Sequence, residues 1–105
     1  MWNIDPNLMC NKHLLGEHVE MHMFASCLRR GKSIQGYIDK GLVEVENIYV
    51  RHELLVREMV SRNFNHKSPM KLIFGPAAGF VNREKSMKDL SNRCVRCRLR
   101  IEGKK

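Results

Sequence analysis

Apolar residues recur three and four positions apart over the first third of the chain, which is the period of an amphipathic helix. Asp5-Pro6 is a typical helix start, because Asp5 can cap the first turn and Pro6 needs no N–H partner there. We expect one long helix from residue 8 to about residue 30, ended by Gly31. Its buried stripe is predicted to consist of Leu14, either His18 or Val19, Met21, Ala25 and Leu28.

A second periodic stretch runs from about residue 43 to residue 63 and predicts another helix. Between the two helices, Gly36 and Gly41 enclose a short stretch around Tyr37 that can form a helical turn. The inner face of the second helix is predicted to carry Val45, Ile48, Tyr49, Leu55 and Met59.

The remainder of the chain divides into a loop and a basic helix. The segment KLIFGPAAGF, residues 71–80, has no helical period and contains Gly75-Pro76, so we expect an ordered, partly apolar loop with at most a brief extended piece at residues 72–74. Residues 86 to about 102 alternate basic side chains with a few apolar ones, which predicts a basic helix.

These elements predict an all-α fold, a small helical bundle of three main helices with long connecting loops. A chain of 105 residues with 43% hydrophobic content fits one domain, residues 1–105, near the small end of what sustains a core. Residues 85–105 would form the basic C-terminal helix of that domain.

The charge is concentrated near the carboxyl end. The chain has 19 Lys and Arg against 11 Asp and Glu, a formal +8, and residues 83–105 hold nine of the basic and three of the acidic side chains. Such a surplus of positive charge favours binding to a polyanion. Nucleic acid is the first expectation for this partner and an anionic membrane surface the second. No apolar run is long enough to span a bilayer and no secretory signal is visible, so we expect a soluble, intracellular protein with its four cysteines reduced.

The stretch HLLGEHVEMH, residues 13–22, holds three histidines and two glutamates. Helical geometry places His13, Glu17 and Glu20 on one face and puts His18 and His22 on another. Two histidines four positions apart can ligate zinc, but no adequate further ligand lies beside them, so structural histidines are the favoured interpretation.

Cys94 and Cys97 form one C-x-x-C, which is half of a zinc site. Cys10 and Cys27 are seventeen positions apart on the first helix, roughly 25 Å, so they cannot both complete it, while His66 with one of them is conceivable. Reduced thiols are the first interpretation of the pair, a metal site the second and a redox pair the third.

Two motifs carry a family resemblance. H-L-L-G-E-H-V-E-M near the amino terminus, followed by V-R-H-E-L-L-V-R-E-M-V-S-R-N-F-N, resembles the pyrimidine-dimer DNA glycosylases of the phage endonuclease V type. The resemblance covers roughly the first seventy residues. It implies a DNA repair enzyme, a glycosylase with abasic-site lyase activity on damaged double-stranded DNA, with pyrimidine dimers as the expected lesion and without metal or cofactor. We expect the protein to act as a monomer in the cytoplasm, associated with the nucleoid through DNA.

The resemblance also implies residue roles. The backbone amine of the first residue attacks C1′ of the damaged nucleotide, a step that suits an α-amine because its ordinary pKa is about 7.7–8.0 against about 10.4 for lysine. Bulky Trp2 should block removal of the initiator methionine, so the amine would be that of Met1. Glu20 corresponds to the catalytic glutamate that stabilises the sugar cation and moves protons, and His13 to the histidine beside the sugar-phosphate.

Phosphate contacts must come from other residues than in the phage enzyme, because the places of its arginines are taken by Asn3, Val19 and Met23. The residues expected to contact DNA besides His13 are Trp2, Lys12, Arg29, Arg30, Lys32 and the basic C-terminal helix. Two alternatives remain open. One is a basic DNA-binding protein without catalysis, and the other is a metal-binding protein that uses His18 and His22 with Cys94 and Cys97.

Overall fold

The structure is a computed structural model that describes residues 1–103, and within them it is helical with no strand, which confirms the predicted all-α class. The last two residues of the expected C-terminal helix, 104–105, lie outside the described part. The elements are η1 (Pro6–Leu8), α1 (Asn11–Arg29), α2 (Gln35–Asp39), η2 (Val45–Asn47), α3 (Ile48–Ser61), α4 (Arg83–Arg93) and α5 (Val95–Gly103).

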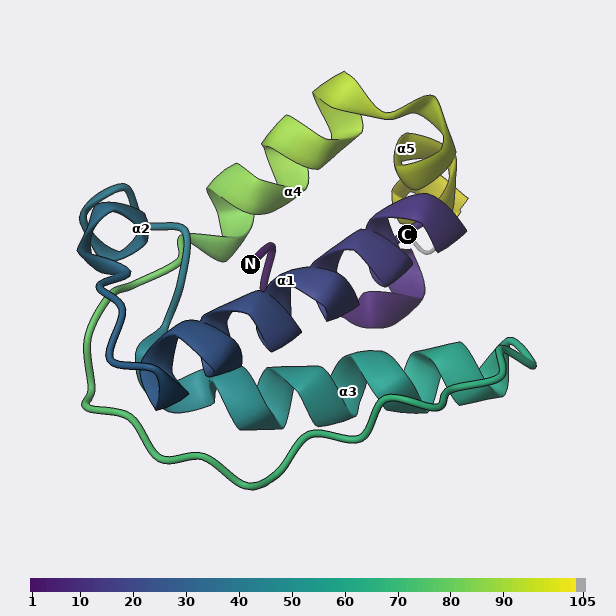
Figure 1. Cartoon of the computed structure of the whole chain (residues 1–105). Helices are drawn as coiled ribbons and strands as arrows, with labels where there is room; N and C mark the ends of the chain where they lie inside the picture. Colours follow the sequence, from purple (N-terminus) through teal and green to yellow (C-terminus); the bar gives the residue numbers. More distant parts are fainter. Residues whose placement is uncertain (104–105) are drawn as a thin grey trace.

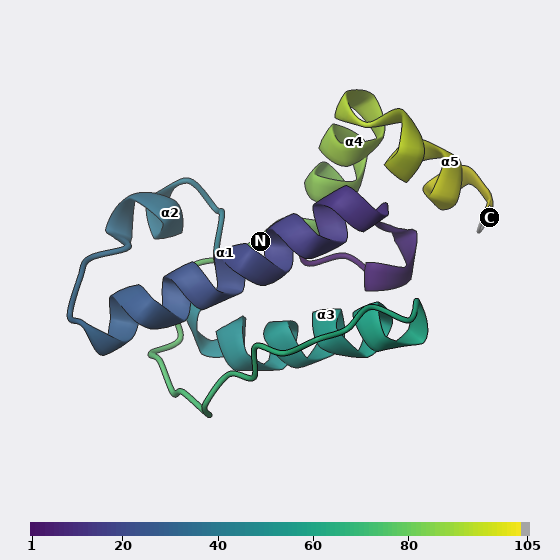
Figure 2. The ribbon, with the colours of Figure 1, turned by 45° about the vertical axis from the view of Figure 1, so that its right-hand side comes forward.

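Helix α1 runs through the middle of the molecule, with α3 on one side and α4 on the other (Figure 1). Helix α5 packs against η1, beside the start of α1 (Figure 2). The long connection from α3 to α4 runs back along α3, and the amino terminus lies between α1 and α4 in Figure 1. The layout therefore places the amino terminus beside α1.

The core lies mainly between α1 and α3. On α1, Leu14, Met21 and Ala25 are fully buried as predicted, and Phe24 joins them. The open choice between His18 and Val19 is decided for His18, which is 7% exposed, whereas Val19 is 65% exposed. The buried residues of α3 are Ile48, Arg51, His52, Leu55 and Met59.

Helix α1 begins at Asn11, three residues later than predicted, because Pro6–Leu8 forms a separate 3-10 turn. Asp5 caps that turn by accepting a hydrogen bond from the backbone N–H of Asn7 at 2.9 Å. The carbonyl groups of this amino-terminal segment are bound by arginines from elsewhere in the chain. The contacts are Arg51 to Ile4, Arg62 to Pro6 and Met9, and Arg100 to Asn7.

A buried ion pair joins α1 to α3. Arg51 donates through Nε and Nη2 to the carboxylate of Glu17, and each residue is 3% exposed. Glu17 also accepts the backbone N–H of Trp2 at 3.1 Å. All charged groups of the pair thus have partners, which a buried pair requires because desolvation of either charge alone is expensive.

The prediction of one continuous C-terminal helix is wrong. Cys94 has an extended backbone, φ −133° and ψ 112°, and divides it into α4 and α5. The break turns α5 back toward η1 and buries Cys97 and Ile101. Nothing in the local sequence is a helix breaker, so the break comes from these long-range contacts.

The connection that contains KLIFGPAAGF is non-helical, as predicted, and no extended strand forms at residues 72–74. It docks on the segment before α3 through the Val45 N–H, which donates to the Ala78 carbonyl at 3.0 Å. Gly79 has φ +89°, and a Cβ there would lie 2.1 Å from the Val43 carbonyl oxygen. Only glycine fits this close contact between the two backbone segments. The contact fixes the backbone next to Phe80, whose side chain is exposed.

Breaking the buried pair should destabilise the fold strongly. We expect Glu17→Ala and Arg51→Met each to lower the free energy of unfolding by about 3–5 kcal/mol, because each leaves an uncompensated buried charge. Chemical denaturation measures the effect, with exposed Glu84→Gln as the control that changes it by less than about 0.5 kcal/mol. A loss below 1 kcal/mol in both pair variants would contradict this account.

Candidate active site

A cavity of about 430 Å³ opens where the amino terminus passes between α1 and α4. Its walls come from four parts of the chain: the first two residues, the middle of α1, the segment after α2, and α4 with the residues before it. The residues of interest on its wall are Met1, Trp2, Glu20, Phe80, Lys85 and Arg93.

The amine of Met1 is held at the wall of this cavity. It forms an ion pair with the carboxylate of Glu20 and donates a hydrogen bond to the Leu42 carbonyl oxygen at 2.8 Å. The Met1 side chain is buried, whereas the Glu20 side chain is 34% exposed. A primary amine and a partly open carboxylate therefore meet at a space that a ligand can enter.

The position of the amine follows from the fold of the first residues. Glu17 binds the N–H of Trp2, and Glu20, one helical turn further along α1, binds the amine of Met1. Asn3 turns the chain with φ +60°, a conformation that asparagine tolerates, and its side chain donates to Glu44 at 3.2 Å. Two successive residues are thus placed by two glutamates on one face of α1.

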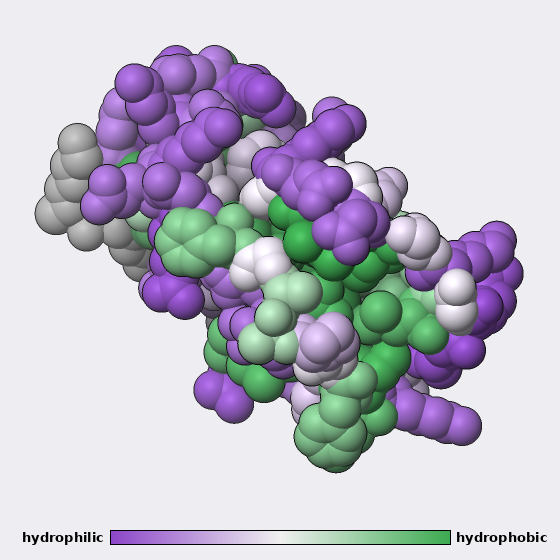
Figure 3. Space-filling view, turned by 90° about the vertical axis from the view of Figure 1, so that its left-hand side faces the viewer, coloured by the Kyte–Doolittle hydropathy of each residue, from purple (hydrophilic) through white to green (hydrophobic). Residues whose placement is uncertain are grey.

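The rim of the cavity is basic and partly apolar. Lys40, Lys85 and Arg93 line it, with Asp89 as an acidic neighbour. Phe80 lines it as well and is 72% exposed. Figure 3 shows that apolar surface gathers on the face that carries α2 and the connection to α4, bordered by hydrophilic side chains.

Of the residues singled out from the sequence, Met1, Trp2 and Glu20 meet at the cavity. The basic residues expected to contact DNA are exposed but do not line it; they are Lys12, Arg29, Arg30 and Lys32. Lys85 and Arg93 line the cavity and belong to the basic C-terminal segment that was expected to contact DNA. Lys40 and Phe80 lie outside that segment and were not singled out.

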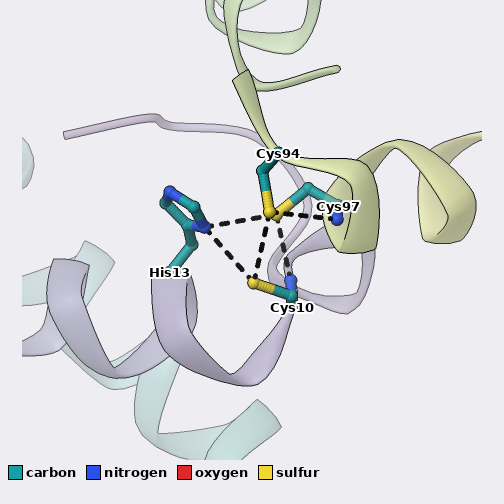
Figure 4. A group of neighbouring side chains, drawn as sticks. All are labelled: Cys10, His13, Cys94 and Cys97. Atoms are coloured by element: carbon teal, nitrogen blue, oxygen red, sulfur yellow. Dashed lines mark hydrogen bonds between the residues drawn. The ribbon is translucent and has the colours of Figure 1, made fainter. Parts of the chain in front are cut away.

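His13 lies on the predicted face of α1 but is turned toward sulfur atoms. Its Nδ1 is 3.2 Å from Cys10 Sγ and 3.6 Å from Cys97 Sγ (Figure 4). Burial lowers the pKa of His13, and the positive charge of Lys12 lowers it further. His13 also contacts Trp2 edge to face, with ring centroids 6.0 Å apart.

His13 belongs to the first of two clusters of metal-ligating side chains. Cys10, His13, Cys94 and Cys97 bring four ligand atoms within 4.8 Å of one another, and so do His18, His22, His52 and His66. The metal-binding alternative from the sequence combined His18 and His22 with Cys94 and Cys97, but the two pairs belong to different clusters. Cys27 belongs to neither.

In both clusters the pKa values of some side chains are shifted from their ordinary values. Burial raises the pKa of the Cys97 thiol to about 12, whereas the backbone N–H of Cys97 lowers the pKa of Cys94. Burial, aided by the other three histidines, lowers the pKa of His18 to about 4. Each cluster thus contains groups whose charged forms are disfavoured without a further partner.

Residues 1–72 match the sequence model of the family described as Pyrimidine dimer DNA glycosylase. The match covers more than half of the chain, and the chain belongs to this family. No protein of curated function matches it, and no solved structure does. The resemblance seen in the two sequence motifs is confirmed, while α4 and α5 lie outside the matched residues.

Proposed function

We propose that the protein is a DNA glycosylase with abasic-site lyase activity, in which the amine of Met1 is the nucleophile and Glu20 the acid/base group. The observation that carries the proposal is the ion pair between these two groups at the wall of an open cavity. Family membership supports a DNA substrate, and we propose that it is duplex DNA containing pyrimidine dimers.

The proposed reaction begins with transfer of a proton from the amine, for which Glu20 is the adjacent acceptor. The free amine attacks C1′, the bond from C1′ to the base breaks, and the base leaves with the electron pair and takes up a proton. Opening of the sugar breaks the C1′–O4′ bond and gives an imine between the Met1 nitrogen and C1′, while protonated Glu20 gives its proton to O4′. Glu20 then removes a proton from C2′, and β-elimination breaks the C3′–O bond and cuts the strand.

The cavity rim supports the proposed DNA contacts. Lys40, Lys85 and Arg93 can neutralise phosphates around a nucleotide that enters the cavity. Exposed Phe80 can stack on a base or fill the gap left by an extruded one, which access to C1′ requires. We further propose that His13, Lys12, Arg29, Arg30 and Lys32 contact the backbone farther from the cavity.

We propose that residues 1–105 act as one monomeric domain at cellular DNA, since α4 completes the wall of a cavity begun by the matched residues. None of the helices that the structure describes has the length and apolar character needed to cross a membrane. The alternative suggested by the positive charge is a DNA-binding protein without catalysis. That alternative assigns no function to the contact between Met1 and Glu20.

Borohydride trapping tests the nucleophile. Incubation with duplex DNA carrying an abasic site or a pyrimidine dimer, followed by borohydride, should give a covalent adduct that peptide mapping assigns to Met1. A three-residue amino-terminal extension should abolish it, because the amine then leaves Glu20. Glu20→Gln should slow strand cleavage by about 10²–10⁴-fold, while Glu84→Gln should leave it unchanged. An adduct on a lysine, or none with either DNA, refutes the proposal.

Equilibrium DNA binding across a salt series tests the rim. Lys85→Ala and Arg93→Ala should each reduce the salt slope by about 1, because each removes one phosphate contact. Phe80→Ala should weaken binding to lesion DNA about 5- to 150-fold without changing the slope, since base stacking contributes about 1–3 kcal/mol. Phe74→Ala is the matched control, because Phe74 is 85% exposed in the same connection and does not line the cavity. Equal effects of the two phenylalanine variants would contradict the assignment.

A further inference from the structure

We propose that Cys10, His13, Cys94 and Cys97 form a structural zinc site that joins α4 and α5 to the start of α1. The proposal goes beyond the DNA chemistry and does not depend on it. It rests on the distances among the four ligand atoms, on the way the chain presents them, and on how little else attaches α4 and α5.

The separations among the ligand atoms are close to those of a tetrahedral zinc site. With Zn–S of about 2.3 Å and Zn–N of about 2.0–2.1 Å, neighbouring ligand atoms lie about 3.8 Å apart for two sulfurs and about 3.6 Å for sulfur and nitrogen. Cys10 Sγ and Cys94 Sγ are 3.8 Å apart, and Cys97 Sγ is 3.6 Å from His13 Nδ1. Cys10 Sγ is closer to that nitrogen, at 3.2 Å, and all four ligand atoms lie within 4.8 Å of one another. Figure 4 shows the four side chains converging from two segments.

Each segment presents its two ligands with a spacing typical of zinc sites. Cys10-x-x-His13 stands at the start of α1, and Cys94-x-x-Cys97 spans the break between α4 and α5. Backbone N–H groups face the sulfurs: that of Cys10 donates to Cys97 Sγ at 3.2 Å and that of Cys97 to Cys94 Sγ at 3.5 Å. Such hydrogen bonds stabilise thiolates, the form that binds metal.

The donor set selects the metal and its role. Three thiolates and one imidazole in tetrahedral arrangement suit zinc, and four protein ligands leave no open position for substrate. The site would therefore be structural. The cysteines are free thiols, and none of them is paired in a disulfide.

The C-terminal helices need such a link. The buried residues of α4 are Ser86 and Leu90, and those of α5 are Cys97 and Ile101. So few buried apolar side chains provide little hydrophobic stabilisation for a strongly basic segment, and small structural units commonly depend on a bound metal instead. The break at Cys94, which no local signal predicted, is what directs its Sγ toward Cys10.

The zinc site would also fix which ring nitrogen of His13 carries the proton. The role of that proton in contacting DNA rests on the proposed function. Coordination through Nδ1 would place the imidazole proton on Nε2, which points away from the cluster in Figure 4. His13 could then donate to a DNA phosphate while its other nitrogen binds zinc.

Metal content tests the site directly. Protein purified without a histidine tag should contain zinc, and Cys94→Ser and Cys97→Ser should each lose one equivalent by elemental analysis. Cys27→Ser is the matched control and should lose none. His13→Cys should keep the metal as a four-cysteine site. His13→Ala should lower the zinc affinity by at least about 10–100-fold, because loss of a residue that merely hydrogen-bonds to a metal ligand already lowers metal affinity by that much.

Cobalt substitution separates this site from any other. The Co²⁺ protein should show intense thiolate-to-cobalt charge transfer and tetrahedral d–d bands, both absent from Cys97→Ser. If Cys97→Ser fails to fold, titration of wild-type protein with Co²⁺ and then Zn²⁺ still decides. Absence of thiolate bands in the reduced wild-type protein, or equal zinc in Cys97→Ser and wild type, would overturn the proposal.

An independent observation supports a second metal site at the histidine cluster. His18 and His22 come from α1, His52 from α3 and His66 from the connection to α4. The Nε2 atoms of His18 and His66 are 3.1 Å apart, as are those of His22 and His52. These distances are close to the roughly 3.3–3.4 Å expected between nitrogens of a tetrahedral site with metal–N bonds of about 2.0–2.1 Å.

We infer that this cluster binds a divalent transition metal of the kind that prefers imidazole, such as zinc. Nδ1 of His52 faces the carboxylate of Glu53 at 3.2 Å, the outer contact that commonly orients a ligating histidine. His18 and His52 are buried. Because His66 belongs to the long connection, the metal would attach that connection to α1 and α3.

The two sites make different predictions for the same measurements. Wild-type protein should hold two equivalents of metal, and His66→Ala should hold one, with its thiolate-to-cobalt bands intact. Asn65→Ala, a change at the exposed neighbour, should hold two. Chelation should accelerate proteolysis within residues 64–80 of wild-type protein, while His66→Ala should be cleaved rapidly with or without chelator. Equal metal content in His66→Ala and wild type would overturn the second site.

Discussion

The buried pair of Glu17 and Arg51 is the interaction on which the rest of the structure depends. Its carboxylate binds the guanidinium from α3 and the N–H of Trp2, and the guanidinium also binds the Ile4 carbonyl. Two buried charges are stable only when their polar atoms are all paired, so the amino-terminal segment must pass at this place. The amine of Met1 consequently reaches Glu20, three residues beyond Glu17 on the same face of α1.

The wall of the cavity is formed by residues within the family match and by residues beyond it. The matched residues 1–72 supply the amine, the carboxylate and the pair that positions them. Phe80, Lys85 and Arg93 lie beyond the match and supply the opposite wall. In the proposed enzyme, the catalytic groups would thus come from the part of the chain that matches the family, and some of the DNA contacts from the part beyond the match.

Helix α1 and the residue before it contribute side chains to three different groups. Glu17 and Glu20 face the amino terminus, while His18 and His22 face α3 and the connection after it. Cys10 and His13, at its start, face α5. Because side chains three or four positions apart share a face and adjacent ones do not, the helical period separates Glu17 and Glu20 from His18 and His22. His13 shares the face of the glutamates but lies one turn before Glu17, so its position along α1 keeps it apart from them.

Much of the fold could be predicted from local pattern. The all-α class, the two long helices and the non-helical segment at residues 71–80 follow from hydrophobic period and from Gly-Pro chemistry, which act within a turn or two of chain. The face shared by Glu17 and Glu20 was predictable for the same reason. Val19 and His18 were not distinguished, because adjacent residues border the same stripe and only packing against α3 decides between them.

The sequence by itself determined the helices, the family motifs and the residue types available for chemistry. Only the tertiary structure decided which of them meet: Met1 with Glu20, Cys10 with Cys94, and His18 with His66. It also decided the break at Cys94, where local helix preference gives way to contacts with residues more than eighty positions away. The physical reason is that spacing encodes neighbours along one helix, whereas meetings between distant segments depend on how all the helices pack at once.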